Sequence, residues 1–384
     1  MHSSTAAMGE LTVVQRKSLS WGLRMLGFVG MDVNHQGTFS GMRAIFGSIL
    51  NVSLFFLTIV EILHQTNRLR SLQGMLEPLA GCYQCIIKTL SLAIARRQLR
   101  ELLLQIGKFK DTSALSVELR NRLQNIQNKV DRFLKIYICT LSVACATFIV
   151  LPLTEQSLPF PINSLEIFKG FPQYKILYVL ESFTLVFLAL VVLGWDVMFY
   201  SFVSCIYCEF EVVKDEFKNL EWNGEEFQQK FNAAIDHHQV VLSCLPNLNS
   251  ICEMTLLNQF LTIAGTICAS LFLLRSEGLD ISHMLQQLTS LAGILFQSYL
   301  ACFAGSSLSD QSESVGMVVY SAPFWIDAPV EVKKMIVMVI QRSQRDEGLA
   351  IRGMGKVDMQ LFTKIAKLGV SCLNAMLALD AGKK

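Results

Sequence analysis

Long apolar segments recur along the chain and alternate with polar ones. An α-helix rises about 1.5 Å per residue, so about 20 apolar residues cross the roughly 30 Å of hydrocarbon in a bilayer. Seven segments meet this requirement, and the pattern therefore predicts an all-α membrane protein with seven transmembrane helices. The predicted spans are residues 44–63, 72–95, 134–154, 176–204, 254–274, 283–304 and 357–379.

Three long segments between the spans, 96–132, 205–252 and 305–356, also have a helical pattern. Residues 99–109 and 227–245, for example, repeat apolar side chains at intervals of three and four, as one face of a helix does. We therefore expect the membrane helices to continue beyond the membrane and to pack together there as an anchor.

Basic residues are distributed unequally between the two sides of the predicted membrane. The segments on the side of the N-terminus carry 22 Lys and Arg residues, and those on the opposite side carry 7. Because Lys and Arg favour the cytoplasmic side, we expect a cytoplasmic N-terminus and an extracellular C-terminus, opposite to a G-protein-coupled receptor. One unit, 1–379, then comprises a cytoplasmic segment 1–43, six helices in 44–304, a cytoplasmic anchor in 305–356 and a last helix in 357–379.

The composition agrees with a membrane protein and argues against several other classes. Hydrophobic residues make up 52% of the 384 residues and charged residues only 17%, against about a quarter in soluble domains. The net charge of +2 gives no reason to expect nucleic acid as a partner. Most of the eleven cysteines lie in apolar segments, so no disulfide framework is indicated. We find no motif of an enzyme, a metal site or a cofactor site.

Asp196 is the best candidate for an ionised side chain within the membrane. Such groups are costly there and are usually paired or functional, and we favour an ion pair over a role in transport. Lys88 lies within about two turns of the cytoplasmic end of its span, so we expect its side chain to reach the interface.

The last predicted span has one small and weakly polar face. Ser371, Asn374, Ala375 and Ala378 lie on this face at helical spacing. Such a face either packs closely against another helix or lines a water-filled pore, and the pattern alone leaves both alternatives open.

The C-terminal part of the chain resembles the signature of the insect odorant receptors, and the resemblance extends over about residues 72–379. The matching residues are Cys302, Gly305, Ser312, Tyr320, Trp325, the triplet Arg342-Ser343-Gln344, Phe362 and Ser371, with Asp196, Phe199 and the segment His237-His238-Gln239 upstream. Two features depart from the family pattern. The spacing from Tyr320 to Trp325 is one residue longer, and Cys372 stands where an aromatic residue is common.

This resemblance implies a function and a set of partners. Such proteins are subunits of odorant-gated, non-selective cation channels in the plasma membrane of olfactory sensory neuron dendrites. A variable odorant-binding subunit, which this chain resembles, assembles with a shared co-receptor as a tetramer. The partners would be a small volatile odorant, the co-receptor, membrane lipid and permeating cations. The last helix would line the pore, which assigns Ser371, Asn374, Ala375 and Ala378 to it.

The family places its odorant pocket in the outer halves of spans two, three, four and six. Residue sets in these halves are mostly apolar with one or two polar groups, as small-molecule sites tend to be. The residues expected to line the pocket are Leu79, Cys82, Tyr83, Cys145, Phe148, Ile149, Tyr178, Ser182, Phe183, Met284, Gln287, Leu288 and Leu291.

A gustatory-type receptor and a secondary transporter are the two alternative functions. A gustatory-type receptor channel of the same superfamily would carry a different C-terminal signature. A secondary transporter would show inverted repeats and interrupted helices near the centre of the membrane, and the sequence has no internal repeat.

Overall fold

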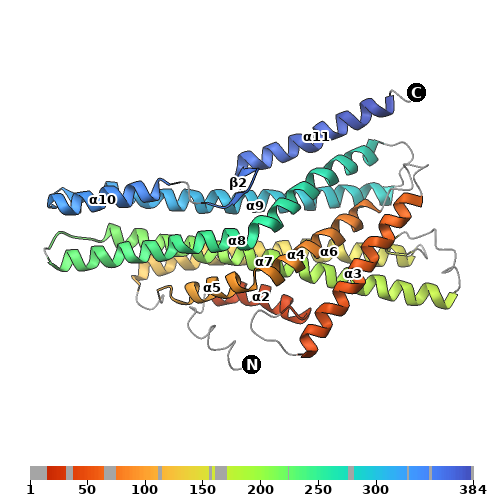
Figure 1. The fold of residues 1–384 in the computed structure, drawn as a ribbon, viewed down its shortest axis with the longest axis horizontal. Helices are drawn as coiled ribbons and strands as arrows, with labels where there is room; N and C mark the ends of the chain where they lie inside the picture. The colour runs from red at the N-terminus through yellow and green to blue at the C-terminus, as the bar shows by residue number, and fades with distance from the viewer. Residues whose placement is uncertain are drawn as a thin grey trace.

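Helices dominate the computed structural model of the chain (Figure 1). The structure describes residues 15–31, 38–64, 75–110, 115–154, 158–160, 171–223, 225–275, 281–326, 328–345 and 348–381. The elements are α2 (Gln15–Phe28), α3 (Thr38–His64), α4 (Leu76–Ile94), α5 (Arg96–Gly107), α6 (Val117–Thr154), α7 (Phe171–Lys218), α8 (Glu225–Arg275), α9 (Ile281–Ser321), the 3-10 turn η4 (Pro323–Trp325), α10 (Val330–Ser343), β1 (Ala350–Ile351), β2 (Gly355–Lys356) and α11 (Met359–Ala381).

The described residues confirm an all-α membrane protein. Each predicted span corresponds to a helix: α3, α4, α6, α7, α8, α9 and α11. Among the described residues, five of these helices are long and apolar enough to cross a membrane, and α4 with α5, which bend by 69° at their junction, adds a sixth. That α11 is a seventh span stays a prediction, as does the orientation of the termini.

Four helices are much longer than a membrane is thick. The helices α6, α7, α8 and α9 contain 38, 48, 51 and 41 residues. With 48 residues, α7 extends about 72 Å, more than twice the hydrocarbon thickness. The expected continuation of the membrane helices is therefore confirmed. Their far ends lie at the left of Figure 1, where α10 packs on α9.

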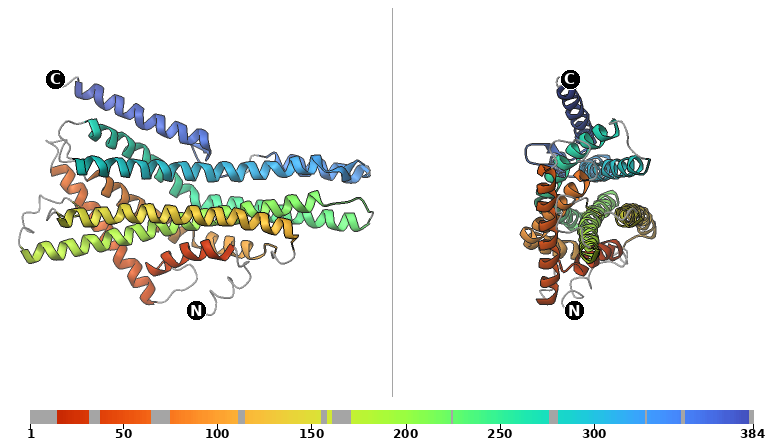
Figure 2. Two further views of the ribbon diagram at one scale, coloured as in Figure 1. Left: turned by 180° about the vertical axis from the view of Figure 1, so that it is seen from behind. Right: turned by 90° about the vertical axis from the view of Figure 1, so that its right-hand side faces the viewer.

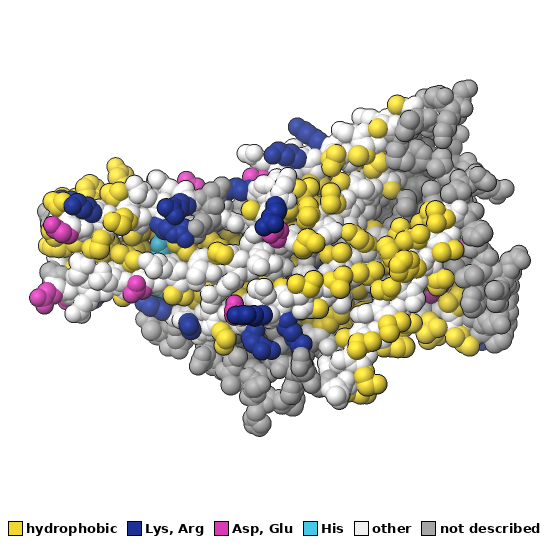
Figure 3. Space-filling view, in the orientation of Figure 1, with side chains coloured by type: hydrophobic (Ala, Val, Ile, Leu, Met, Phe, Trp, Pro, Cys, Tyr) yellow, Lys and Arg dark blue, Asp and Glu magenta, His cyan; other side chains and the backbone are white. Residues whose placement is uncertain are grey.

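The surface divides into an apolar half and a charged half. In Figure 3, hydrophobic side chains spread over the right-hand half, whereas Lys and Arg gather over the left-hand half and the centre. On α3, the large side chains of Ile45, Phe46, Ile49 and Phe56 are exposed. An apolar surface of this extent is unstable in water and marks contact with lipid or protein. We therefore place the membrane around the right-hand half.

An aromatic cluster stabilises the charged half. Phe217, Phe227 and Phe231 are fully buried, and with Phe324 they form ring pairs with centroid distances of 5.4 to 6.1 Å. These residues join α7, α8 and η4. Ring pairs at this spacing add to the stabilisation that burial provides, and they belong to the one large core that continues into the membrane half.

The N-terminal segment, for which no packing was predicted, contains helix α2. This helix lies along α7 (Figure 2). The two backbones approach closely at Gly22, where a Cβ would lie 2.7 Å from the backbone nitrogen of Met198. A larger residue at this position would therefore force the helices apart.

A short hairpin, also not predicted, connects the anchor to α11. Strand β1 pairs antiparallel with β2, and Gly353 and Gly355 have φ values of +86° and +91°, which glycine adopts without strain. The backbone nitrogens of Ala350 and Arg352 donate to side chains of α8, at 2.8 Å from Asn249 Oδ1 and 2.9 Å from Glu253 Oε1. The hairpin therefore fixes the start of α11 beside α8.

Candidate functional site

A cavity of about 210 Å³ lies between α4, α6, α7, α8 and α9 in the membrane half. Its lining is mostly apolar, as small-molecule sites are. An apolar cavity of about 150 Å³ can hold benzene, so this one has room for a single ring or a short chain. The lining residues are Pro78, Ala80, Gly81, Gln84, Leu141, Ala144, Cys145, Thr147, Phe148, Leu185, Leu188, Ala189, Val192, Leu193, Thr266, Thr289, Gly293, Ile294 and Gln297.

Small residues create the space. Ala80 and Gly81 on α4, Ala144 on α6, Ala189 on α7 and Gly293 on α9 all contribute to the lining. A Cβ at Gly293 would meet no atom within 4 Å. Helices packed around positions without bulky side chains leave a void that the surrounding residues do not fill.

A buried polar cluster borders the cavity. The carboxylate of Asp196 on α7 accepts from Lys88 Nζ on α4 at 2.6 Å, from Tyr137 Oη on α6 at 2.7 Å and from Gln297 Nε2 on α9 at 2.8 Å. All four side chains are buried. We call these four residues the Asp196 cluster. Gln297 belongs both to this cluster and to the cavity lining.

The ion pair expected for Asp196 is confirmed, but the expectation for Lys88 is wrong. The side chain of Lys88 does not reach the interface: it is 1% exposed and is directed to Asp196. Its ammonium also lies 5.0 Å from the ring centroid of Trp195. The carboxylate and the aromatic face together offset the cost of burying the ammonium, which explains why this lysine stays inside.

The cavity contains two of the predicted pocket residues, Cys145 and Phe148. Three others have different surroundings. Tyr83 Oη donates to Asn258 Oδ1 at 2.5 Å, Tyr178 Oη donates to the backbone oxygen of Ile149 at 2.6 Å, and Phe183 is exposed. These contacts tie helices together outside the cavity.

Six further predicted pocket residues are described by the structure and are not among those that line the cavity. Cys82 is buried in a neighbouring apolar cluster against which Ile149 packs, and Leu291 packs on the main core. Leu79 and Ser182 are partly buried, Leu288 is exposed, and the side chains of Met284 and Gln287 lie outside the described residues.

The cavity lies closer to the charged half than the predicted pocket does. On α7 it involves Leu185 to Leu193, and on α9 Thr289 to Gln297, about one to two turns deeper. The signal that could have located it is the combination of small residues with Gln84 and Gln297 inside apolar spans, because an amide there requires a partner.

The predicted pore face of α11 is open in the single chain. Ser371, Asn374, Ala375 and Ala378 are all exposed. The helix lies at the edge of the bundle and projects away from it (Figures 1 and 2). Close packing of this face is therefore not realised within the described part of this chain.

A different face of α11 holds it against the bundle. A Cβ at Gly369 would lie 2.7 Å from Cγ2 of Ile267 on α8. The rings of Phe362 on α11 and Tyr299 on α9 lie 6.0 Å apart between centroids. Helix α9 thus contacts the cavity through Gln297 and contacts α11 two residues further on.

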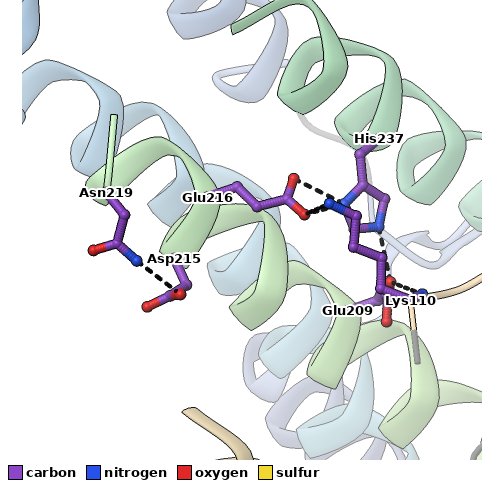
Figure 4. Close-up of polar contacts among 6 residues, drawn as sticks. All are labelled: Lys110, Glu209, Asp215, Glu216, Asn219 and His237. Atoms are coloured by element: carbon purple, nitrogen blue, oxygen red, sulfur yellow. Dashed lines mark hydrogen bonds and ion pairs between the residues drawn. The ribbon is translucent and has the colours of Figure 1, made fainter. Parts of the chain in front are cut away.

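A charged cluster outside the membrane joins α7 and α8 (Figure 4). His237 lies 17 residues, about 25 Å along the helix, before the predicted span of α8. Its Nε2 lies 2.8 Å from Glu209 Oε1 and its Nδ1 lies 3.0 Å from Glu216 Oε2. The ammonium of Lys110 also pairs with Glu216. Because each ring nitrogen faces a carboxylate oxygen, both must donate, and the ring is protonated.

The protonated state of His237 gives the protein a pH dependence. Burial lowers the pKa of His237, but the hydrogen bonds to Glu209 and Glu216 outweigh it and raise the pKa from 6.5 to about 9. A group whose pKa rises on folding stabilises the folded protein. Its full contribution is present when the pH is below the pKa of the unfolded state, and it is lost as the pH rises through the pKa of the folded state. We expect the difference in thermal stability between wild type and His237→Asn to be largest below pH 6.5 and to disappear above pH 9. Thermal unfolding in detergent from pH 6 to pH 10 measures it, and a difference that is independent of pH contradicts this assignment.

Comparison with known proteins identifies relatives of this chain. The family profile "7tm Odorant receptor" matches residues 70–370. Odorant receptor Or2 of Anopheles gambiae is 24% identical over 141 residues. The match covers 36% of this chain and only 36% of the length of that receptor. Odorant receptor 47a of Drosophila melanogaster is 21% identical over 359 residues, which cover 84% of this chain and 89% of that receptor.

The fold is also similar to that of a solved structure. The insect olfactory receptor OR5 from Machilis hrabei, in complex with eugenol, superposes with a TM-score of 0.79 over 94% of this chain and 98% of that one. The identity is 13%, so this likeness concerns the fold alone.

Proposed function

This chain belongs to the 7tm odorant receptor family, and from that membership we propose that it is the odorant-binding subunit of a ligand-gated, non-selective cation channel. The observation that carries the proposal is the mostly apolar cavity of about 210 Å³ between the membrane helices. Burial of a small volatile there contributes about 25 cal/mol per Å² of apolar surface removed from water. A protein of similar fold, OR5 from Machilis hrabei, has been solved in complex with eugenol.

A ligand opens a channel only if it binds the open state more tightly than the closed one. In this chain, both α8 and α9 contact the cavity and the proposed pore helix: on α8, Thr266 lines the cavity and Ile267 packs at Gly369 of α11. On α9, an aromatic contact makes the connection. Gln297 lines the cavity, and Tyr299, two residues on, contacts Phe362 of α11. We propose that a change in the packing of α9 around the ligand is passed to α11 by this contact.

The open face of α11 supports a pore between subunits. In the described part of the chain, all four of its residues are exposed: Ser371, Asn374, Ala375 and Ala378. We propose that four such helices, from this chain and a shared co-receptor, enclose the conducting path. In the same proposal the charged half, including 305–356, is the cytoplasmic anchor, and the assembly resides in the plasma membrane.

Substitution of Phe148 tests whether the odorant binds in the cavity or at the predicted pocket residues outside it. Phe148 is partly buried and lines the cavity. Loss of roughly 50 Å² of apolar contact with the ligand costs about 1.3 kcal/mol at about 25 cal/mol per Å², so Phe148→Ala should raise the odorant concentration for half-maximal current about five- to tenfold. The control Phe183→Ala removes a predicted pocket residue that lies outside the cavity, and we expect a shift of less than about twofold. Dose–response curves at matched surface expression measure both. A larger shift for Phe183→Ala would place the site elsewhere.

A further inference from the structure

The orientation of the Gln297 side-chain amide in the cavity is fixed by its hydrogen bond to Asp196. An ionised carboxylate has only acceptor oxygens, so the amide nitrogen of Gln297 must face Asp196, at 2.8 Å from Oδ2. The amide carbonyl oxygen is then directed away from the carboxylate. Because Gln297 lines the cavity, this oxygen is the acceptor that the cluster presents to a bound molecule.

The bond to Asp196 also changes what this amide can bind. A hydrogen bond from the N–H to an anionic acceptor polarises the amide, which makes its carbonyl oxygen a stronger acceptor and its second N–H a weaker donor. The remaining hydrogen bonds of Asp196, from Lys88 and Tyr137, hold the carboxylate in place. Gln297 is therefore prepared to recognise a donor group rather than an acceptor.

Two threonine hydroxyls of the lining are weaker acceptors for that donor than the polarised amide. The hydroxyl of Thr147 donates to the backbone oxygen of Ala144 at 2.7 Å, and that of Thr266 donates to the backbone oxygen of Thr262 at 2.9 Å, so both keep acceptor lone pairs but neither is bonded there to an anion. Gln84 is the other amide of the lining, and it is not among the residues that hydrogen-bond to Asp196. Most of the remaining lining is apolar and includes Phe148 and Leu185.

We propose that Gln297 is the specificity-determining residue of this cavity and that it selects neutral odorants with a hydroxyl group at one end of an apolar body. The hydroxyl donates to the carbonyl oxygen of Gln297, and the apolar body occupies the space beside Phe148 and Leu185. A ligand without a donor leaves this polarised oxygen unpaired in an apolar site, which is unfavourable. This inference rests on one part of the proposed function, namely that the cavity binds the odorant. It does not depend on channel gating.

Matched pairs of ligands test this assignment without any current measurement. The full chain, purified in detergent, is titrated with benzyl alcohol and benzyl methyl ether, and with hexan-1-ol and its methyl ether, and the dissociation constants are derived from the shift of thermal unfolding. One hydrogen bond corresponds to about 0.5–1.5 kcal/mol, so wild type should bind each alcohol about two- to tenfold more tightly than its ether. Equal affinity within the pairs, including the absence of binding by both members, overturns the assignment.

Variants identify the residue responsible. In Gln297→Met, which keeps the length of the side chain without its amide, the preference for alcohols should fall to about onefold. Gln297→Asn, a milder change that is too short to contact both Asp196 and the ligand, should lower it partly. Gln84→Met should retain the preference. Loss of the preference in Gln84→Met but not in either Gln297 variant contradicts the proposal. An intact preference in wild type without ligand-evoked current would instead refute channel gating and leave this assignment standing.

Discussion

Replacing Lys88 with Met should destabilise the protein by about 3–5 kcal/mol, because the carboxylate of Asp196 would remain buried without its counter-ion. The ammonium and the carboxylate lie 2.6 Å apart, and their side chains are 1% and 2% exposed. Neither can turn to water without opening the contact between α4 and α7. Unfolding in detergent, together with the amount of protein at the cell surface, measures the effect.

The second partner and a surface pair provide the controls. Asp196→Asn should be similarly destabilising, since it leaves the ammonium unpaired. The double variant Lys88→Met/Asp196→Asn removes both charges and keeps an amide that can bond to Tyr137 and Gln297, so it should be more stable than either single variant. Arg97→Met breaks the exposed pair with Glu101 and should cost only about 0.3–0.5 kcal/mol. Additive effects of the two cluster substitutions would show that the pair does not stabilise this fold.

Replacing Ala375 with Leu should reduce odorant-evoked current roughly tenfold while surface expression stays unchanged, because added apolar bulk favours a dry, closed constriction. Ala375 is exposed in the described part of the chain, so a larger side chain there does not disturb a buried position. Asn374→Ala should change ion selectivity, since it removes a polar group from the proposed path. Current recording with ion substitution measures both effects.

A control on the same helix separates a pore from a packing surface. Val370 is also exposed and lies at the border of this face, about 140° around the helix from Ala375 but about 40° from Asn374, so Val370→Leu should reduce the current much less than Ala375→Leu does. If Ala375→Leu instead abolishes surface expression, its face packs against another helix. If Ala375→Leu and Asn374→Ala both reach the surface with wild-type current and permeability, α11 of this subunit does not line the pore.

The membrane helices could be predicted from the sequence because a bilayer imposes a simple requirement. Every span needs about 20 apolar residues, and a window of that length separates α3, α6, α7 and α9 from their surroundings. The helical continuation of these spans followed from apolar residues at intervals of three and four. The β1–β2 hairpin escaped prediction, because strands of two residues leave no periodic signal.

The cavity could be predicted only in part, because a helix turns by about 100° at each residue. Tyr83 and Gln84 are adjacent in sequence, yet Tyr83 bonds to Asn258 and Gln84 lines the cavity. Which of the two faces the interior depends on the rotation of α4 against its neighbours. The same holds for Asp196: its need for a cation could be inferred, but the partner Lys88 is 108 residues away, and only packing brings the two together.

Whole-cell recording during application of small neutral volatiles is the decisive measurement for an odorant-gated channel subunit. Cells should express this chain together with the shared co-receptor, and control cells the co-receptor alone. We predict a non-selective cation current that at least one volatile evokes only when this chain is present. Phe148→Ala should shift the dose–response curve of that volatile to higher concentrations. Chains that reach the surface but conduct no volatile-evoked current, or responses that are the same without this chain, would contradict the proposed function.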